Sequence, residues 1–237
     1  LFMKVRWTSR KGRRRKFNND AAAVVCKNGF IVIAIADASE KPISGTNPEG
    51  QSLASYWVES CVKTISGTPE ALIDSNKLIE LLRTQQKLLR DYFLHDTASY
   101  GVLILNTSSS IGSWLFVGDC LLGSVDGRGQ VSWLHKPHRA SECSALELTT
   151  NEGCTLTKSL NAKRFAYPES LCLTNIEKST ALILATDGYW YEHLMQGVEM
   201  NCLEDDNSVL KIESGTLQLL SNTDARNLFW QVPSLSN

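Results

Sequence analysis

The sequence has no Cys-x-x-Cys pair, no apolar run long enough to span a membrane and almost no net charge, and each absence excludes a class of protein. Its seven cysteines are scattered and odd in number, which indicates reduced, mostly buried thiols rather than a disulfide framework or a zinc site. The basic first residues lack the apolar stretch of a signal peptide. A formal net charge of −1 over 237 residues gives no general attraction to nucleic acid. We therefore expect a cytoplasmic protein that needs neither a membrane nor nucleic acid as a partner.

The charge that is present is distributed unevenly. Residues 1–16 contain eight lysines and arginines and no acid, whereas the rest of the chain carries 16 basic and 25 acidic residues. This pattern predicts a basic N-terminal arm on an acidic body. The segment RKGRRRK could bind nucleic acid or an acidic partner. We favour the simpler interpretation that Arg15 serves a site on the body and that the rest of the arm is solvated.

Apolar periodicity predicts an α+β protein. Strand-like segments flank a pair of amphipathic helices, without the regular strand–helix alternation of parallel α/β folds. There is no internal repeat and no low-complexity linker, so residues 1–237 are expected to form one domain, with an unassigned tail over residues 214–237. Residues 136–178 are expected to be loop with short elements. The helices are expected at residues 52–65, 75–94 and 189–196, and the strands on either side of Asn28-Gly29 and at residues 100–107, 113–120, 121–125, 130–135, 181–185 and 207–213.

Four of the apolar strands end or begin at an aspartate, namely Asp37, Asp119, Asp187 and Asp206. Carboxylates at strand ends can point into a shared cleft at the rim of a sheet. Several of them would repel one another there unless a divalent cation compensated their charge, and Mg²⁺ or Mn²⁺ prefers such oxygen ligands. The alternative for each aspartate taken alone is an ordinary turn or capping residue.

These acids fall in short motifs that together resemble the metal-dependent protein phosphatase family of type 2C, also called PPM. Five motifs occur in the expected order, and the two long predicted helices lie between the second and the third. The resemblance covers roughly residues 12–213. The matching segments are Arg15 followed by Asn18-Asn19-Asp20, then Ala36-Asp37-Ala38-Ser39-Glu40, Gly118-Asp119-Cys120, Thr186-Asp187-Gly188-Tyr189-Trp190 and Asp206-Asn207-Ser208.

The resemblance implies a four-layer α-β-β-α sandwich, in which two antiparallel sheets are flanked by helices and a metal cleft lies at one edge. Two Mg²⁺ or Mn²⁺ ions are implied, with a possible third. Asp37 would bridge the two ions, and Asp187 and Asp206 would complete the first site. Asp119 would lie nearby and could help to hold a weaker third ion.

The second implied metal site depends on three further residues. The carbonyl of Ala38 would help to hold the ion, Asn19 stands where many members have a glutamate that contacts it through water, and Asp20 would orient water in the outer shell. Asn19 brings no negative charge, and Ala38 replaces the usual glycine. The affinity of the second site should therefore be lower than in members that keep those residues.

The implied activity is hydrolysis of phosphoserine or phosphothreonine in a phosphorylated protein, by a chain that we expect to be a monomer. A water activated by the metal ions would be the nucleophile, so no phospho-enzyme is needed. Arg15 would bind the phosphate, and it joins Asp37 and Asp187 as the implied catalytic residues. The departures at Asn19 and Ala38, with a short segment between Asp187 and Asp206, leave an alternative: a weak or inactive pseudophosphatase that serves as a protein-binding module.

Overall fold

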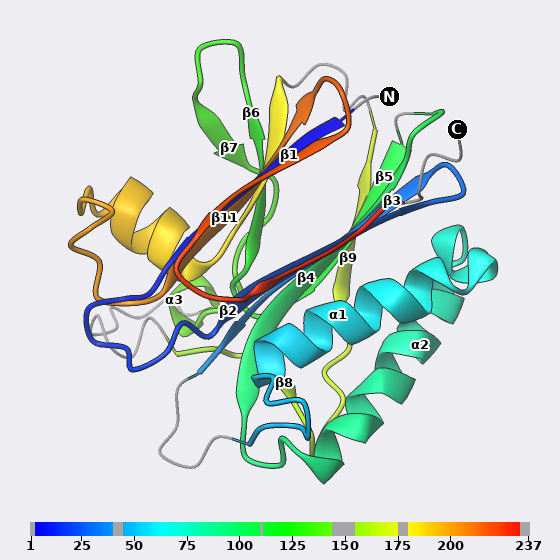
Figure 1. The fold of residues 1–237 in the computed structure, drawn as a ribbon, viewed down its shortest axis with the longest axis horizontal. Helices are drawn as coiled ribbons and strands as arrows, with labels where there is room; N and C mark the ends of the chain where they lie inside the picture. The colour runs from blue at the N-terminus through cyan, green and yellow to red at the C-terminus, as the bar shows by residue number, and fades with distance from the viewer. Residues whose placement is uncertain (1–2, 40–44, 110, 144–154, 175–179, 233–237) are drawn as a thin grey trace.

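The computed structural model describes residues 3–39, 45–109, 111–143, 155–174 and 180–232, and they form two β-sheets packed face to face with helices outside them (Figure 1). The predicted α+β sandwich is confirmed. Within these residues no helix is both long and apolar enough to cross a membrane.

The seven-stranded sheet contains the central hairpin that the sequence predicts at Asn28-Gly29. Both turn residues have positive φ, 52° and 75°, as a tight two-residue hairpin requires. The strand order is β13-β2-β3-β4-β5-β9, and β8 pairs with β4 beside this path. The strands are β2 (Asp20–Lys27), β3 (Phe30–Ala38), β4 (Thr97–Asn106), β5 (Ile111–Val117), β8 (Leu160–Asn161), β9 (Glu169–Leu173) and β13 (Leu228–Gln231).

The six-stranded sheet has the order β12-β1-β11-β10-β6-β7. Its inner face packs against the inner face of the other sheet through one apolar cluster that includes Trp7, Ile33, Trp114 and Leu184. This shared core fixes the two sheets relative to each other, which matters because the candidate site draws residues from both. The strands are β1 (Met3–Arg10), β6 (Leu121–Val125), β7 (Val131–Trp133), β10 (Ala181–Ala185), β11 (Asn207–Ser214) and β12 (Gln218–Thr223).

The basic arm expected over residues 1–16 is only partly an arm. Its first half is β1, which pairs with β11 and β12, and every second side chain from Met3 to Trp7 is buried in the core between the sheets. The lysines and arginines of β1 alternate with these apolar residues, so the basic charge belongs to one face of a strand. The total charge of the segment does not reveal that buried and basic side chains alternate along it.

The sheets are mixed, whereas the sequence predicted two antiparallel sheets. The difference comes from the unassigned tail. Within the described part of residues 214–237, β12 pairs parallel to β1 and β13 pairs parallel to β2. Each tail strand thus covers the edge of one sheet, which leaves fewer backbone groups unpaired there.

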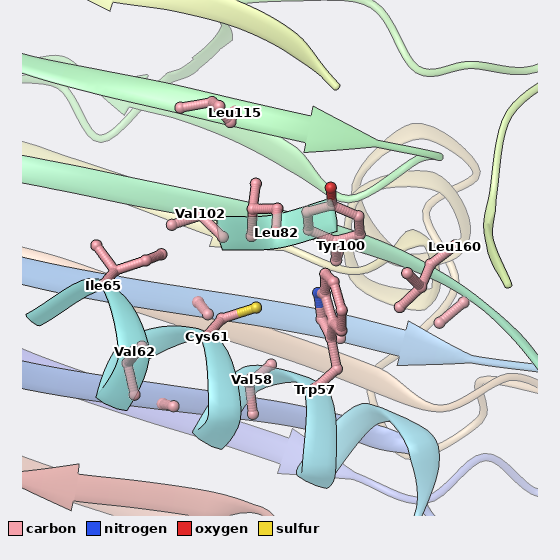
Figure 2. Packing of buried hydrophobic residues seen from close by; sticks show 14 of the residues in the cluster. Trp57, Val58, Cys61, Val62, Ile65, Leu82, Tyr100, Val102, Leu115 and Leu160 are labelled. Carbon is pink, nitrogen blue, oxygen red and sulfur yellow. The ribbon is translucent and has the colours of Figure 1, made fainter. Parts of the chain in front are cut away.

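The two long helices both belong to the layer on the seven-stranded sheet. Figure 2 shows Trp57, Cys61 and Ile65 of α1 directed at the strands, together with Tyr100 of β4 and Leu82 of α2. Ser52 caps α1 by accepting a hydrogen bond from the amide of Ser55. The helical bounds are α1 (Leu53–Ser66), η1 (Pro69–Leu72), α2 (Ser75–Leu88), η2 (Leu89–Asp91), α3 (Ala140–Cys143) and the π-helix η4 (Gly188–Met195).

The sequence predicted a helical layer on each sheet, but the layer outside the six-stranded sheet is thin. The eight-residue π-helix η4 packs there, with Trp190 against Leu121 and Ala185. Trp133 of β7 lies across Gly123 of β6 and covers part of the same face. The segment between Asp187 and Asp206 contains no helix besides η4.

We expect Gly101→Ala to destabilise the fold by about 1–3 kcal/mol, because a Cβ at Gly101 would lie 1.8 Å from the Cη2 atom of the fully buried Trp114. Urea unfolding measures this free energy. The matched control is Gly127→Ala, where a new Cβ meets nothing within 4 Å, so its effect should stay within about 0.5 kcal/mol. Equal stability of the two variants would contradict the packing described here.

Candidate active site

The predicted acids lie where strands begin or end. Asp20 opens β2 and Asp37 is the penultimate residue of β3, and the two are direct partners across the β2–β3 ladder. Asp187 follows β10, Asp206 precedes β11, and Asp119 lies between β5 and β6. Both sheets therefore contribute acids to one edge of the sandwich.

A hydroxyl group joins the two sheets at this edge. Thr186 Oγ1, at the end of β10, donates to Asp20 Oδ2 at 2.9 Å, and it accepts from the amide of Ser208 at 3.0 Å. Next to it, a Cβ at Gly188 would lie 2.2 Å from the carbonyl oxygen of Asp206, so only glycine lets the start of η4 approach β11 this closely. The arrangement holds Asp187 and Asp206 beside the Asp20–Asp37 pair.

The crowding of these buried acids raises their pKa values. Burial and the negative charges of Asp20 and Asp187, among others, raise the pKa of Asp37 well above its usual value. Burial, reinforced by the charge of Asp206, likewise raises the pKa of Asp20. Burial raises the pKa of Asp187 to about 7 and that of Asp206 to about 6. Without compensating positive charge these carboxylates are unfavourable in their ionised forms.

The donor atoms suit a hard divalent cation. Asp20 Oδ1 and Asp187 Oδ1 are buried without a hydrogen-bond partner, which is costly unless a cation or water binds there. Oxygen-rich carboxylate clusters are what Mg²⁺ and Mn²⁺ prefer. Among the described residues, no group of three or more His, Cys, Asp or Glu side chains is arranged so that it could hold a metal ion. The case for a divalent cation here therefore rests on the two carboxylate oxygens without hydrogen-bond partners and on the preference of such cations for oxygen ligands.

Asp206 organises the loop that carries two other predicted residues. Its Oδ1 accepts from the amide of Gly12 at 2.9 Å and its Oδ2 from the amide of Asn19 at 2.8 Å. The Asn19 carbonyl in turn accepts from the amide of Ala38 at 3.1 Å. Asn19, Ala38 and Asp206 are therefore neighbours, as the resemblance implies.

Arg15 lies on this loop and pairs with an acid that the sequence analysis missed. Its Nε donates to Asp205 Oδ1 at 2.6 Å and its Nη2 to Asp205 Oδ2 at 2.5 Å. The Arg15 side chain keeps 30% of its exposure. The charge of Asp205, with smaller contributions from Asp37 and Asp206, raises the pKa of Arg15. Arg15 is thus a permanently charged, partly exposed group next to the buried acids.

Asp119 is placed beside Asp187 by a second arginine that the sequence analysis also missed. Arg139 Nε donates to Asp119 Oδ2 at 2.8 Å, and Arg139 Nη2 donates to Asp187 Oδ2 at 2.7 Å. Ser99 Oγ donates to the other oxygen of Asp119 at 2.6 Å. Nothing in the local sequence around Arg139 signals these contacts, because the segment has no clear periodicity.

The histidines of the segment LHKPHRA have structural contacts. His138 Nδ1 accepts from the amide of Gly118 at 2.9 Å, and His135 Nε2 accepts from Trp114 Nε1 at 2.8 Å. Burial lowers the pKa of His135 to about 4. Both rings therefore serve as hydrogen-bond acceptors that hold neighbouring strands and turns.

The fold is that of solved serine/threonine phosphatases. Stp1 from Staphylococcus aureus matches with a TM-score of 0.71 at 13% identity, over 91% of this chain and 96% of its own. The PPM Ser-Thr phosphatase MsPP from Mycobacterium smegmatis, in complex with cacodylate, matches with 0.62 at 16% identity, over 89% and 98%. RsbX in complex with magnesium matches with 0.54 at 12% identity, over 87% and 92%. No model of a known protein family and no curated protein matches the sequence.

We expect Asp37→Asn to stabilise the metal-free protein, because the variant removes a carboxylate that burial and neighbouring acids disfavour when ionised. In EDTA its Tm should rise by about 2–4 °C for each 1 kcal/mol gained. In Mn²⁺ the wild-type Tm should rise and that of the variant should not. Circular dichroism during heating measures both.

The matched control is Asp91→Asn, which changes an exposed carboxylate in η2 and should behave as the wild type does in both buffers. A lower Tm for Asp37→Asn in EDTA, together with a full Mn²⁺ shift, would contradict the electrostatic description of the site.

Proposed function

We propose that the chain is a metal-dependent phosphatase of the PPM type that hydrolyses phosphoserine or phosphothreonine in proteins. The observation that supports this most strongly is the gathering of Asp20 and Asp187 around Asp37, which is also near Arg15, with two buried carboxylate oxygens that lack a partner. The fold shared with serine/threonine phosphatases supports the substrate class. A cytoplasmic monomer remains our expectation.

The residues present suit two Mg²⁺ or Mn²⁺ ions. Asp37 would lie between the ions, Asp187 and Asp206 would bind the first, and the carbonyl of Ala38 would bind the second. Asn19 and Asp20 would contact the second ion through water. The chemistry that such ions supply when bound is a water whose pKa is lowered toward neutrality, and compensation of negative charge on the phosphate oxygens.

The chain's own part in the reaction is to bind and orient the phosphate. Arg15 offers a planar, permanently charged fork that matches two phosphate oxygens. In the structure the fork is held by Asp205, whose Oδ1 also accepts from the amide of Asp206 at 2.7 Å. Asp205 thereby connects the phosphate-binding arginine to a proposed metal ligand and limits the positions that Arg15 can take.

The alternative, a pseudophosphatase that binds proteins, is favoured by two observations. Arg15 is already paired with Asp205, and Arg139 already occupies one oxygen of Asp187. A chain in which Arg15 never leaves Asp205 could not bind phosphate through that fork and would keep the fold without turnover. The two functions differ in one measurable respect, which is catalysis by protein that has bound metal.

We expect the purified chain to hydrolyse p-nitrophenyl phosphate and a phosphothreonine peptide when Mn²⁺ is present, and to stop when EDTA is added. Asp37→Asn should lower kcat by about 100-fold or more, because the transition-state charge then lacks its compensation. Asp91→Asn should retain full activity. Turnover that survives EDTA would refute the metal mechanism, and metal binding without turnover would establish the pseudophosphatase.

We expect Arg15→Ala to lower kcat/KM about 10–100-fold, because a charge-assisted phosphate contact contributes about 1.5–3 kcal/mol. The matched control is Arg14→Ala, the neighbouring arginine, whose side chain is 76% exposed and pairs with Glu204. Steady-state kinetics on the phosphothreonine peptide measure both variants. Equal losses in the two would indicate general attraction by the basic loop rather than a specific role for Arg15.

A further inference from the structure

Arg139 is a buried cation placed between two of the predicted metal-binding acids. Its side chain is 3% exposed, and one guanidinium bonds Asp119 Oδ2 and Asp187 Oδ2 at the same time. Asp119 itself is 7% exposed at its side chain. Breaking such a pair would leave an uncompensated buried charge, which is strongly unfavourable.

The surroundings fix the position of this guanidinium. It lies 4.6 Å from the ring centre of Trp190 and 4.8 Å from that of Tyr191. Trp190 Nε1 donates to the backbone carbonyl of Asp119 at 2.8 Å, so the same aromatic wall also holds the acid. A guanidinium stacked on aromatic rings and bonded through its edge is held in one orientation.

The backbone around Arg139 is equally well anchored. The preceding residue, His138, donates from its amide to the carbonyl of Gly118 at 2.9 Å and accepts from the Gly118 amide through Nδ1. Arg139 itself forms a β-bridge with Leu156. The segment that carries Arg139 is therefore attached directly to the turn that carries Asp119.

The two carboxylate oxygens of Asp187 have different surroundings. Its Oδ2 accepts from Arg139, whereas its Oδ1 is buried without a hydrogen-bond partner and remains available to a cation. In Asp119, by contrast, both carboxylate oxygens accept hydrogen bonds, Oδ2 from Arg139 and Oδ1 from Ser99. A divalent ion between Asp119 and Asp187 would have to displace, or lie against, a guanidinium that is always charged.

We propose that Arg139 permanently supplies, between Asp119 and Asp187, the positive charge that a third divalent ion could bring there, so that the chain binds two ions and Asp119 is not a metal ligand. This inference rests on the proposed function. Arg139 is a positioning residue: it acts through Asp187, whose carboxylate it orients and partly neutralises.

The test is the number of Mn²⁺ ions that the full chain binds, measured by isothermal titration with Mn²⁺ alone. The wild type should bind two ions. Arg139→Met keeps the approximate length of the side chain but removes its charge, so Asp119 Oδ2 and Asp187 Oδ2 lose their shared donor and a third ion should bind. Arg139→Lys keeps the charge and should bind two. Circular dichroism verifies that each variant is folded.

Two further variants assign the third ion. Asp119→Asn combined with Arg139→Met should return the count to two, because the additional ligand is then lost. Arg90→Met removes an arginine that donates to the carbonyl of Ala162 instead of to carboxylates, and should leave the count at two.

Each outcome decides between the proposals. Three ions in the wild type, or two ions in both the wild type and a folded Arg139→Met, would overturn this inference and leave the phosphatase proposal standing. If Arg139→Met does not fold, the wild-type count decides, with two ions supporting the inference. No bound Mn²⁺ in the wild type would overturn both proposals.

Discussion

The constraint that shapes the candidate site is the mutual repulsion of carboxylates that are buried at one edge of the sandwich. Asp37 shows it most clearly, because burial and neighbouring acids raise its pKa well above the usual value. The groups around this edge are mainly donors: amides at Gly12 and Asn19 meet Asp206, and a guanidinium meets Asp119 and Asp187. The remaining unpartnered oxygens are those for which the chain itself provides no donor, which is where a cation is most favourable.

The acids of this edge are carried by strands, and the thin layer contributes contacts to them through Trp190 of η4, which donates to the carbonyl of Asp119. The acids are attached to β2, β3, β10 and β11, and these strands are held by the apolar core between the sheets. On the outer face of the six-stranded sheet, η4 and the ring of Trp133 occupy the place of a longer helical layer.

The sequence predicted the end of β10 before Asp187 and the start of β11 after Asp206, because an apolar run next to an aspartate is a local pattern, whereas the strand predicted to include Asp119 ends at Val117. It also predicted the hairpin at Asn28-Gly29, whose positive φ values depend on two adjacent residues. It could not predict the parallel pairing of β12 and β13, since strand partners in a sheet are chosen by tertiary packing. Asp205 was missed for a related reason. Beside Glu204 and Asp206 it is one of three consecutive acids, and only its contact with Arg15, 190 residues away, distinguishes it.

The two arginines of the site show how burial assigns different functions to one side chain. Arg15 keeps 30% of its exposure and pairs with the half-exposed Asp205, so water can replace that partner and an incoming phosphate can compete for the fork. Arg139 has 3% exposure, two carboxylates and an aromatic wall, and no comparable replacement is available to it. An exchangeable guanidinium suits the binding and release of an anion. A guanidinium that cannot exchange suits a fixed charge. In the proposed function the same residue type would thus bind the substrate at one end of the acidic edge and hold carboxylates at the other.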